Sequence, residues 1–214
     1  MKRGNPYPHR YKHGKIEEAT DLQTFSQLMN KIKKSWGSFD VLFIKSLLAL
    51  FYWTGLRKSE VVGAISHRYW TKKHGWKWTQ PVKGIMKEDI WIKGRFFYVK
   101  AIARKHGKRE APLIIPLDLP YVDLIVEQWR RTPEKEKVWS ISEVHVWRLI
   151  KDIAPNLYLH FFRFNRITKF CENPKLSIAD ICSWTGLTPQ TIGKYLERSG
   201  RFIKRVAVTL KEEA

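Results

Sequence analysis

Three side chains near the end of the chain are of the types that transfer a phosphoryl group. His160 and Arg163 are three residues apart, so on a helix they share one face, where they can hold a phosphate. Tyr195 lies at the end of a short amphipathic segment, and its hydroxyl is a nucleophile that can attack such a phosphate. This combination suggests covalent phosphoryl transfer through a tyrosine.

The charge of the chain indicates which kind of molecule would carry the phosphate. Its 214 residues include 40 Lys and Arg against 20 Asp and Glu, which leaves a net charge of +20. An unbalanced positive field of this size implies a polyanionic partner, for which nucleic acid is the default. A membrane surface would require a basic amphipathic helix, and the sequence shows no clean one. We therefore expect double-stranded DNA as the partner and no membrane.

The composition is that of one globular domain inside the cell. Hydrophobic residues make up 43% and charged residues 28% of the chain. Cys171 and Cys182 show no metal-ligand spacing, so we expect reduced thiols and no metal site. The first residues contain no apolar signal region, and the most apolar run, 39–53, is too short to span a bilayer. We expect a cytoplasmic, nucleoid-associated protein with a buried helix at that run.

The apolar periodicity predicts helices, then a small sheet, then helices again. Residues 1–19 are a basic N-terminal arm without periodicity. The helical patterns lie at 21–32, 40–54, 57–64, 121–131, 142–153 and 160–171, with two short helices around Gly186. A period of two at 89–92, 95–99 and 112–115 predicts three antiparallel strands, with hairpin tips at Lys93-Gly94 and His106-Gly107. The predicted fold class is α+β, mainly α.

Basic and aromatic residues alternate without a helical period in an insertion at about 66–83. They are His67, Arg68, Tyr69, Trp70, Lys72, Lys73, His74, Trp76, Lys77 and Trp78. One interpretation is a nucleic-acid contact loop, with cations on phosphates and rings on bases or sugars. The other is an inserted hairpin with its own small aromatic cluster.

A second stretch, Thr54-Gly55-Leu56-Arg57-Lys58-Ser59-Glu60, ends the predicted buried helix. Here the chain resembles the tyrosine recombinase (phage-integrase) family, which carries a T-G-x-R-x-S-E box, a hairpin lysine, an H-x-x-R pair and a nucleophilic tyrosine in that order. Arg57, Lys105, His160 with Arg163, and Tyr195 follow the same order here. The resemblance covers roughly residues 20–200. Each motif alone is weak, whereas the ordered set is strong.

The resemblance implies a site-specific DNA recombinase whose helical catalytic domain closes around the duplex. Tyr195 would attack a phosphodiester and form a 3′-phosphotyrosine, while Arg57 and Arg163 hold the non-bridging oxygens bidentately. Lys105 would protonate the leaving 5′-oxygen. His160 would stabilise the phosphate or accept the tyrosine proton. No metal or other cofactor is needed, and the family acts as dimers or tetramers on DNA.

The resemblance also suggests supporting residues. Glu60 is expected to support Arg57 or a backbone group, and Lys108 competes with Lys105 for the lysine role. The predicted DNA-binding residues are Lys58, Arg68, Lys72, Lys73, Lys77, Lys108, Arg166 and Lys194. The tail, 201–214, is expected to pack on a neighbouring protomer, as such tails do in this family, or on its own core. Because the first helix already begins near residue 21, we expect a minimal recombinase or a catalytic fragment of a longer one.

The pattern departs from the family about nine residues before the tyrosine. The family places a second histidine or a tryptophan there, whereas this chain has Gly186-Leu187. Trp184 is close enough to supply its indole N–H as a substitute after a local shift.

The same segment also fits other DNA-binding functions. Cys182, Gly186 and Ile192 suit the small, turn and buried positions of a helix-turn-helix, with 188–195 as its recognition helix. The alternative function is therefore a non-enzymatic DNA-binding protein. A type IB topoisomerase-like enzyme that nicks or relaxes DNA would use the same catalytic residues as a recombinase.

Overall fold

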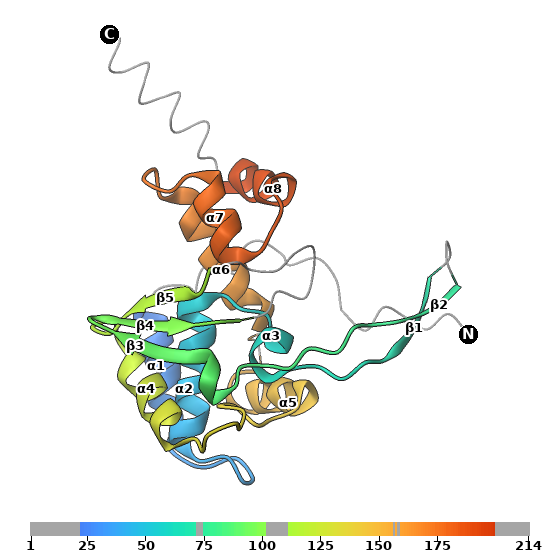
Figure 1. The fold of residues 1–214 in the computed structure, drawn as a ribbon. Coiled ribbons are helices and arrows are strands. Elements are labelled where there is room, and N and C mark those ends of the chain that lie inside the picture. The colour runs from blue at the N-terminus through green and yellow to red at the C-terminus, as the bar shows by residue number, and fades with distance from the viewer. Residues whose placement is uncertain (1–21, 72–74, 102–110, 156, 158, 200–214) are drawn as a thin grey trace.

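The chain folds as a mainly helical α+β protein in a computed structural model that describes residues 22–71, 75–101, 111–155, 157 and 159–199 (Figure 1). In chain order the elements are α1 (Leu22–Lys31), α2 (Val41–Thr54), α3 (Lys58–Val62), β1 (Arg68–Thr71), β2 (Gly75–Trp78), the 3₁₀ helix η3 (Lys87–Asp89), β3 (Ile90–Lys93), β4 (Phe96–Val99), β5 (Leu113–Pro116), α4 (Val122–Arg131), α5 (Glu143–Ile153), α6 (Leu159–Glu172), α7 (Ile178–Thr185) and α8 (Pro189–Ser199). The predicted fold class is confirmed.

Helix α2 forms the centre of the main core, as its apolar sequence predicts. The side chain of Asp40 caps it by accepting from the backbone N–H of Phe43 at 2.7 Å. Gly55 ends it in the left-handed conformation, with φ 63°, and donates to Phe51 O at 2.9 Å. Most α2 side chains between these caps are buried, so the helix is enclosed by the rest of the domain.

The predicted three-stranded sheet is present in the order β3-β4-β5, with both pairs antiparallel. Phe97 is paired with Ile92 on one side and with Ile115 on the other. Alternate residues of the sheet, including Phe97, Val99 and Ile115, are buried in the main core. The sheet therefore covers one side of the helical body with a single apolar face. The predicted hairpin tip at His106-Gly107 lies outside the described residues.

A second, smaller core lies where α6, α7 and α8 meet at one end of the molecule (Figure 1). Its buried members are Ile167, Cys171, Ile181, Ile192 and Leu196. The beginning of α6 belongs instead to the main core, through Phe161 and Phe162. Helix α6 thus connects the two cores, with its first turns in the main core and its later turns in the smaller one.

The insertion at 66–83 contains an antiparallel hairpin, β1–β2, that projects from the helical body (Figure 1). Its strands pair Trp70 with Trp76 and Arg68 with Trp78. A hairpin with an aromatic cluster was one of the two interpretations of this segment. The N-terminal arm and the tail at 201–214 lie outside the described residues. Within the part of the chain that is described, no helix has the length and apolar character to cross a membrane.

Candidate active site

Arg57 lies at the junction of α2 and α3, held by a buried carboxylate. Its backbone N–H donates to Glu60 Oε2 at 2.8 Å, and its guanidinium Nη1 donates to Glu60 Oε1 at 2.7 Å. The Glu60 side chain has no exposed surface, whereas 21% of the Arg57 side chain is exposed. The predicted support of Arg57 by Glu60 is present, and it fixes the direction of a guanidinium that still faces solvent in part.

Arg163 reaches the same carboxylate from the middle of α6. Its Nη1 lies 3.7 Å from Glu60 Oε2 and donates to Gly55 O at 2.9 Å. Its Nη2 donates to Thr185 O at the end of α7, at 2.8 Å. Only 3% of the Arg163 side chain is exposed, so the ion pair and the two carbonyls compensate a buried charge. Arg163 thereby joins the Thr54–Glu60 segment, which we call the arginine box, to α6 and to α7.

Gly55 allows α6 to approach the arginine box closely. A Cβ at this residue would lie 3.0 Å from Arg166 Cβ and 3.3 Å from Arg163 Cα. The φ of 63° is itself disfavoured for residues with a side chain. The glycine of the T-G-x-R pattern is thus required by both the turn and the helix contact.

His160 occupies the first turn of α6, one turn before Arg163. Partial burial lowers the pKa of its imidazole, and the charges of Arg163 and Arg57 lower it further. The imidazole is therefore held neutral at pH 7, as a proton acceptor beside two guanidinium groups. The structure brings Arg57 together with His160 and Arg163, which are far from it in the sequence.

Tyr195 lies on α8 and packs against the helix that carries His160. Its ring centroid is 5.6 Å from that of Phe164, with the planes inclined at 45°. Phe164 follows His160 by one helical turn, a displacement of about 6 Å along the axis. The half-buried Tyr195 therefore contacts α6 one turn beyond His160. Lys105 and Lys108 lie outside the described residues.

Trp184 is close to the arginine box, but its N–H bonds the protein itself. The indole Nε1 donates to Thr54 O at 3.1 Å. The ring makes an edge contact with Phe170, with centroids 5.5 Å apart. A phosphate could receive the Trp184 N–H, as the substitution hypothesis requires, only after this bond to Thr54 is broken.

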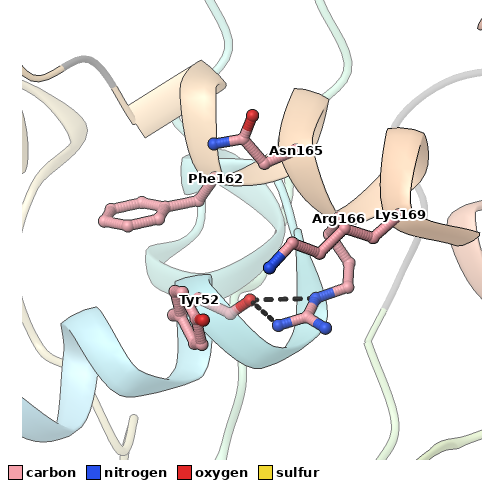
Figure 2. Close-up of a pocket in the computed structure, with 5 residues that line it drawn as sticks. All are labelled: Tyr52, Phe162, Asn165, Arg166 and Lys169. Carbon is pink, nitrogen blue, oxygen red and sulfur yellow. Dashed lines mark hydrogen bonds between the residues drawn. The ribbon is translucent and has the colours of Figure 1, made fainter. Parts of the chain in front are cut away.

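Arg166, a predicted DNA contact, joins α6 to α2 (Figure 2). Its Nε and Nη2 donate to Tyr52 O at 3.1 and 2.7 Å. The guanidinium also lies over the ring of Trp53, 4.9 Å from its centroid, and burial lowers its pKa. These contacts give Arg166 a structural role that the sequence did not reveal. The surrounding pocket is lined by Tyr52, Phe162, Asn165, Arg166 and Lys169.

The other predicted DNA-binding residues that the structure describes are distributed over α3, the β1–β2 hairpin and α8. Lys58 begins α3 and is half-buried. Arg68 and Lys77 are exposed on the β1–β2 hairpin, and Lys194 is exposed on α8. Lys72 and Lys73 lie outside the described residues.

Sequence reasoning missed the two backbone carbonyls that organise the site. Thr185 O accepts from Arg163 and Thr54 O accepts from Trp184, so α7 is attached to α6 and to the arginine box. The only local signal was the glycine after each threonine, because glycine at a helix C-terminus marks the turn where carbonyls lack helical partners.

The arrangement suits the binding of an anion more than that of a metal ion. Among the described residues, no three or more His, Cys, Asp or Glu side chains are grouped so that they could hold a metal ion. The partly exposed guanidinium of Arg57 is of the type that binds phosphate oxygens, whereas Arg163 is buried with both Nη atoms on backbone carbonyls. No protein-family model, curated protein or solved structure matches the chain.

Proposed function

We propose that the protein is a tyrosine recombinase that cleaves and rejoins DNA through a 3′-phosphotyrosine intermediate. The observation that carries the proposal is the shared carboxylate of Glu60, which lies 2.7 Å from Arg57 and 3.7 Å from Arg163. Two guanidinium groups from distant parts of the chain are thereby held beside His160. A pair of preorganised cations at a phosphate lowers the barrier to its substitution.

The reaction assigns one task to each residue. The hydroxyl of Tyr195 attacks the phosphorus, its proton passes to the neutral imidazole of His160, and the bond from phosphorus to the 5′-oxygen breaks. Arg57, whose side chain is 21% exposed, stabilises the charge on the non-bridging oxygens, and Arg163 reaches them only after its bonds to Gly55 O and Thr185 O are released. Lys105, assigned by the family resemblance, gives its proton to the leaving 5′-oxygen. A 5′-hydroxyl from a second strand then reverses these steps and rejoins the DNA.

The test is a trap for the covalent intermediate. Binding sites are first selected from a random duplex pool, and the selected site is then nicked at each position in turn. A nick just downstream of the scissile phosphate releases the short 5′-hydroxyl fragment, so religation fails and the protein stays attached. The proposal predicts an adduct in EDTA that blocks the 3′ end of the cleaved strand. Sequence-specific binding without an adduct on any nicked site would contradict it.

A second candidate function is DNA binding without catalysis, and the small core favours it. Helices α7 and α8 are joined through Gly186, which has φ 64°, and they pack with α6 around Ile181, Ile192 and Leu196. Three helices with such a turn resemble a helix-turn-helix, in which α8 would enter the major groove. On this account Lys194→Ala weakens DNA binding and Arg57→Ala does not. Plasmid relaxation without strand exchange would instead identify a topoisomerase-like enzyme.

A further inference from the structure

One face of the β1–β2 hairpin carries three exposed tryptophans. Cross-strand partners share a face, so the pairs Trp70–Trp76 and Arg68–Trp78 place all four side chains on the same side. Trp70, Trp76 and Trp78 are 61%, 57% and 65% exposed. The described residues thus leave a large aromatic surface open to solvent, which is the usual sign of a binding surface.

Two tryptophan rings on this face contact each other without stacking, and one of them lies beside the cation of Arg68. The rings of Trp70 and Trp76 meet edge to face, with centroids 5.6 Å apart and planes at 72°. The guanidinium of Arg68 lies 4.7 Å from the centre of the Trp76 ring. These contacts cover part of the Trp70 and Trp76 rings, but more than half of each of the three tryptophans is exposed, so ring surface remains open to planar ligands.

The hairpin is attached firmly to the body at its base. Ala64 and Val82 exchange both backbone hydrogen bonds at 2.8 Å, and Ile85 N donates to Val61 O at 2.8 Å. A Cβ on Gly84 would lie 2.7 Å from Gly63 N, so the two segments at the base of the hairpin pass close to each other at this glycine pair. The hairpin is therefore held away from the body on a defined stem (Figure 1).

The positive charge of this part of the chain indicates a nucleic acid as the partner. The sequence contains no Asp or Glu from 61 to 87, while Arg68 and Lys77 are exposed on the hairpin. The indole rings and the Arg68 cation on one face of the hairpin match the bases and phosphates of a single strand, whose unstacked bases can stack on aromatic rings. In a duplex the base faces are covered by their neighbours.

We propose that the aromatic face of the β1–β2 hairpin, formed by Arg68, Trp70, Trp76 and Trp78, binds single-stranded DNA by stacking unpaired bases on the indole rings. This inference rests on the proposed function, because strand exchange is the step that exposes unpaired bases beside the protein. Arg68 contacts the phosphates, and the indole rings contact the bases. The hairpin then holds a cleaved strand while it is transferred.

The experiment compares three labelled DNAs in fluorescence anisotropy. They are oligo(dT), an abasic strand with the same number of phosphates, and a duplex of the same length. The protein carries Tyr195→Phe, so that no covalent step contributes. We expect oligo(dT) to bind more tightly than the abasic strand. Each of Trp70→Ala, Trp76→Ala and Trp78→Ala should raise the Kd for oligo(dT) about tenfold and leave the duplex Kd unchanged.

Two further variants control for folding and for general aromatic exposure. Trp147→Ala removes a 53% exposed tryptophan on α5 and should leave the Kd for oligo(dT) unchanged. Trp→Phe at all three hairpin residues keeps a stacking ring at each site and should retain more affinity than the triple alanine variant.

Several results would overturn the inference. One is equal affinity for oligo(dT) and the abasic strand, and another is an unchanged Kd for oligo(dT) in the triple alanine variant. A third is that the triple alanine variant loses only its binding to duplex DNA, its binding to anionic vesicles or its self-association. The two proposals fail separately. Covalent adducts without tryptophan-dependent binding of oligo(dT) overturn only this inference, whereas that binding without any adduct overturns only the recombinase.

Discussion

Nη1 of Arg163 lies 3.7 Å from Oε2 of Glu60, and neither side chain has more than 3% of its surface exposed. This pair joins the arginine box at the end of α2 to the middle of α6. Removing one partner of a buried ion pair leaves the other charge uncompensated. The assembly of the site therefore depends on Glu60 as much as on the arginines.

Glu60→Ala should lower the free energy of unfolding by about 3–5 kcal/mol, because it leaves the buried Arg163 charge unpaired. Urea denaturation measures the loss. The matched control is Glu88→Ala, which removes the ion pair between Glu88 and Lys83, whose side chains are both about half exposed. That change should cost less than about 1 kcal/mol. Equal effects of the two substitutions would contradict the role given to Glu60.

Gly55→Ala should destabilise the fold through both its backbone conformation and its contact with α6. Gly94 has a similar φ, 59°, but a Cβ there meets nothing within 4 Å, so Gly94→Ala measures the conformational cost alone. We expect Gly55→Ala to cost about 1–3 kcal/mol more than Gly94→Ala, because of overpacking against Arg166. An equal loss of stability in the two variants would mean that α6 shifts away from the new Cβ at residue 55 without cost.

His160 should make the stability of the protein depend on pH near neutrality. Its pKa in the folded state is below the ordinary value of 6.5, so as the pH falls through that value the unfolded chain takes up a proton first. The free energy of unfolding should therefore decrease below about pH 6.5. His160→Gln should flatten that part of the profile.

The cause of the lowered pKa of His160 can be tested separately by NMR titration. Removing one of the nearby charges in Arg57→Gln should raise the pKa of the His160 ring, although burial and Arg163 still lower it. An unchanged His160 pKa in this variant would show that Arg57 is not electrostatically coupled to it.

Trp184→Phe should separate a structural function of the indole from a catalytic one. The phenyl ring keeps the contact with Phe170 but loses the hydrogen bond to Thr54 O, which should cost about 1 kcal/mol of stability. If this bond is the whole function, DNA cleavage persists in the variant at a temperature where it is folded. A fully folded variant with cleavage reduced by about 10²-fold or more would instead show that the indole acts on the phosphate.

The local elements could be predicted from the sequence, because they depend on neighbouring residues. Asp40 and Gly55 mark the ends of α2, and the period of two gave the three strands within a residue or so. The H-x-x-R spacing placed His160 and Arg163 one turn apart on α6.

The contacts between elements could not be predicted in the same way. Arg166 was expected on DNA but bonds Tyr52 O, 114 residues away, and Trp184 bonds Thr54 O at a separation of 130 residues. Such contacts depend on how α2, α6 and α7 pack, which no local pattern specifies.

The central claim is that Tyr195 forms a covalent bond to DNA, and peptide mapping of the trapped adduct tests it most directly. The matched control is Tyr98→Phe, a half-buried tyrosine on β4 that stacks on Trp91. We predict that wild-type protein and Tyr98→Phe form the adduct in EDTA, that the attached nucleotide maps to Tyr195, and that Tyr195→Phe binds the same DNA without forming it. An adduct in Tyr195→Phe, or a nucleotide attached to another residue, would contradict the account.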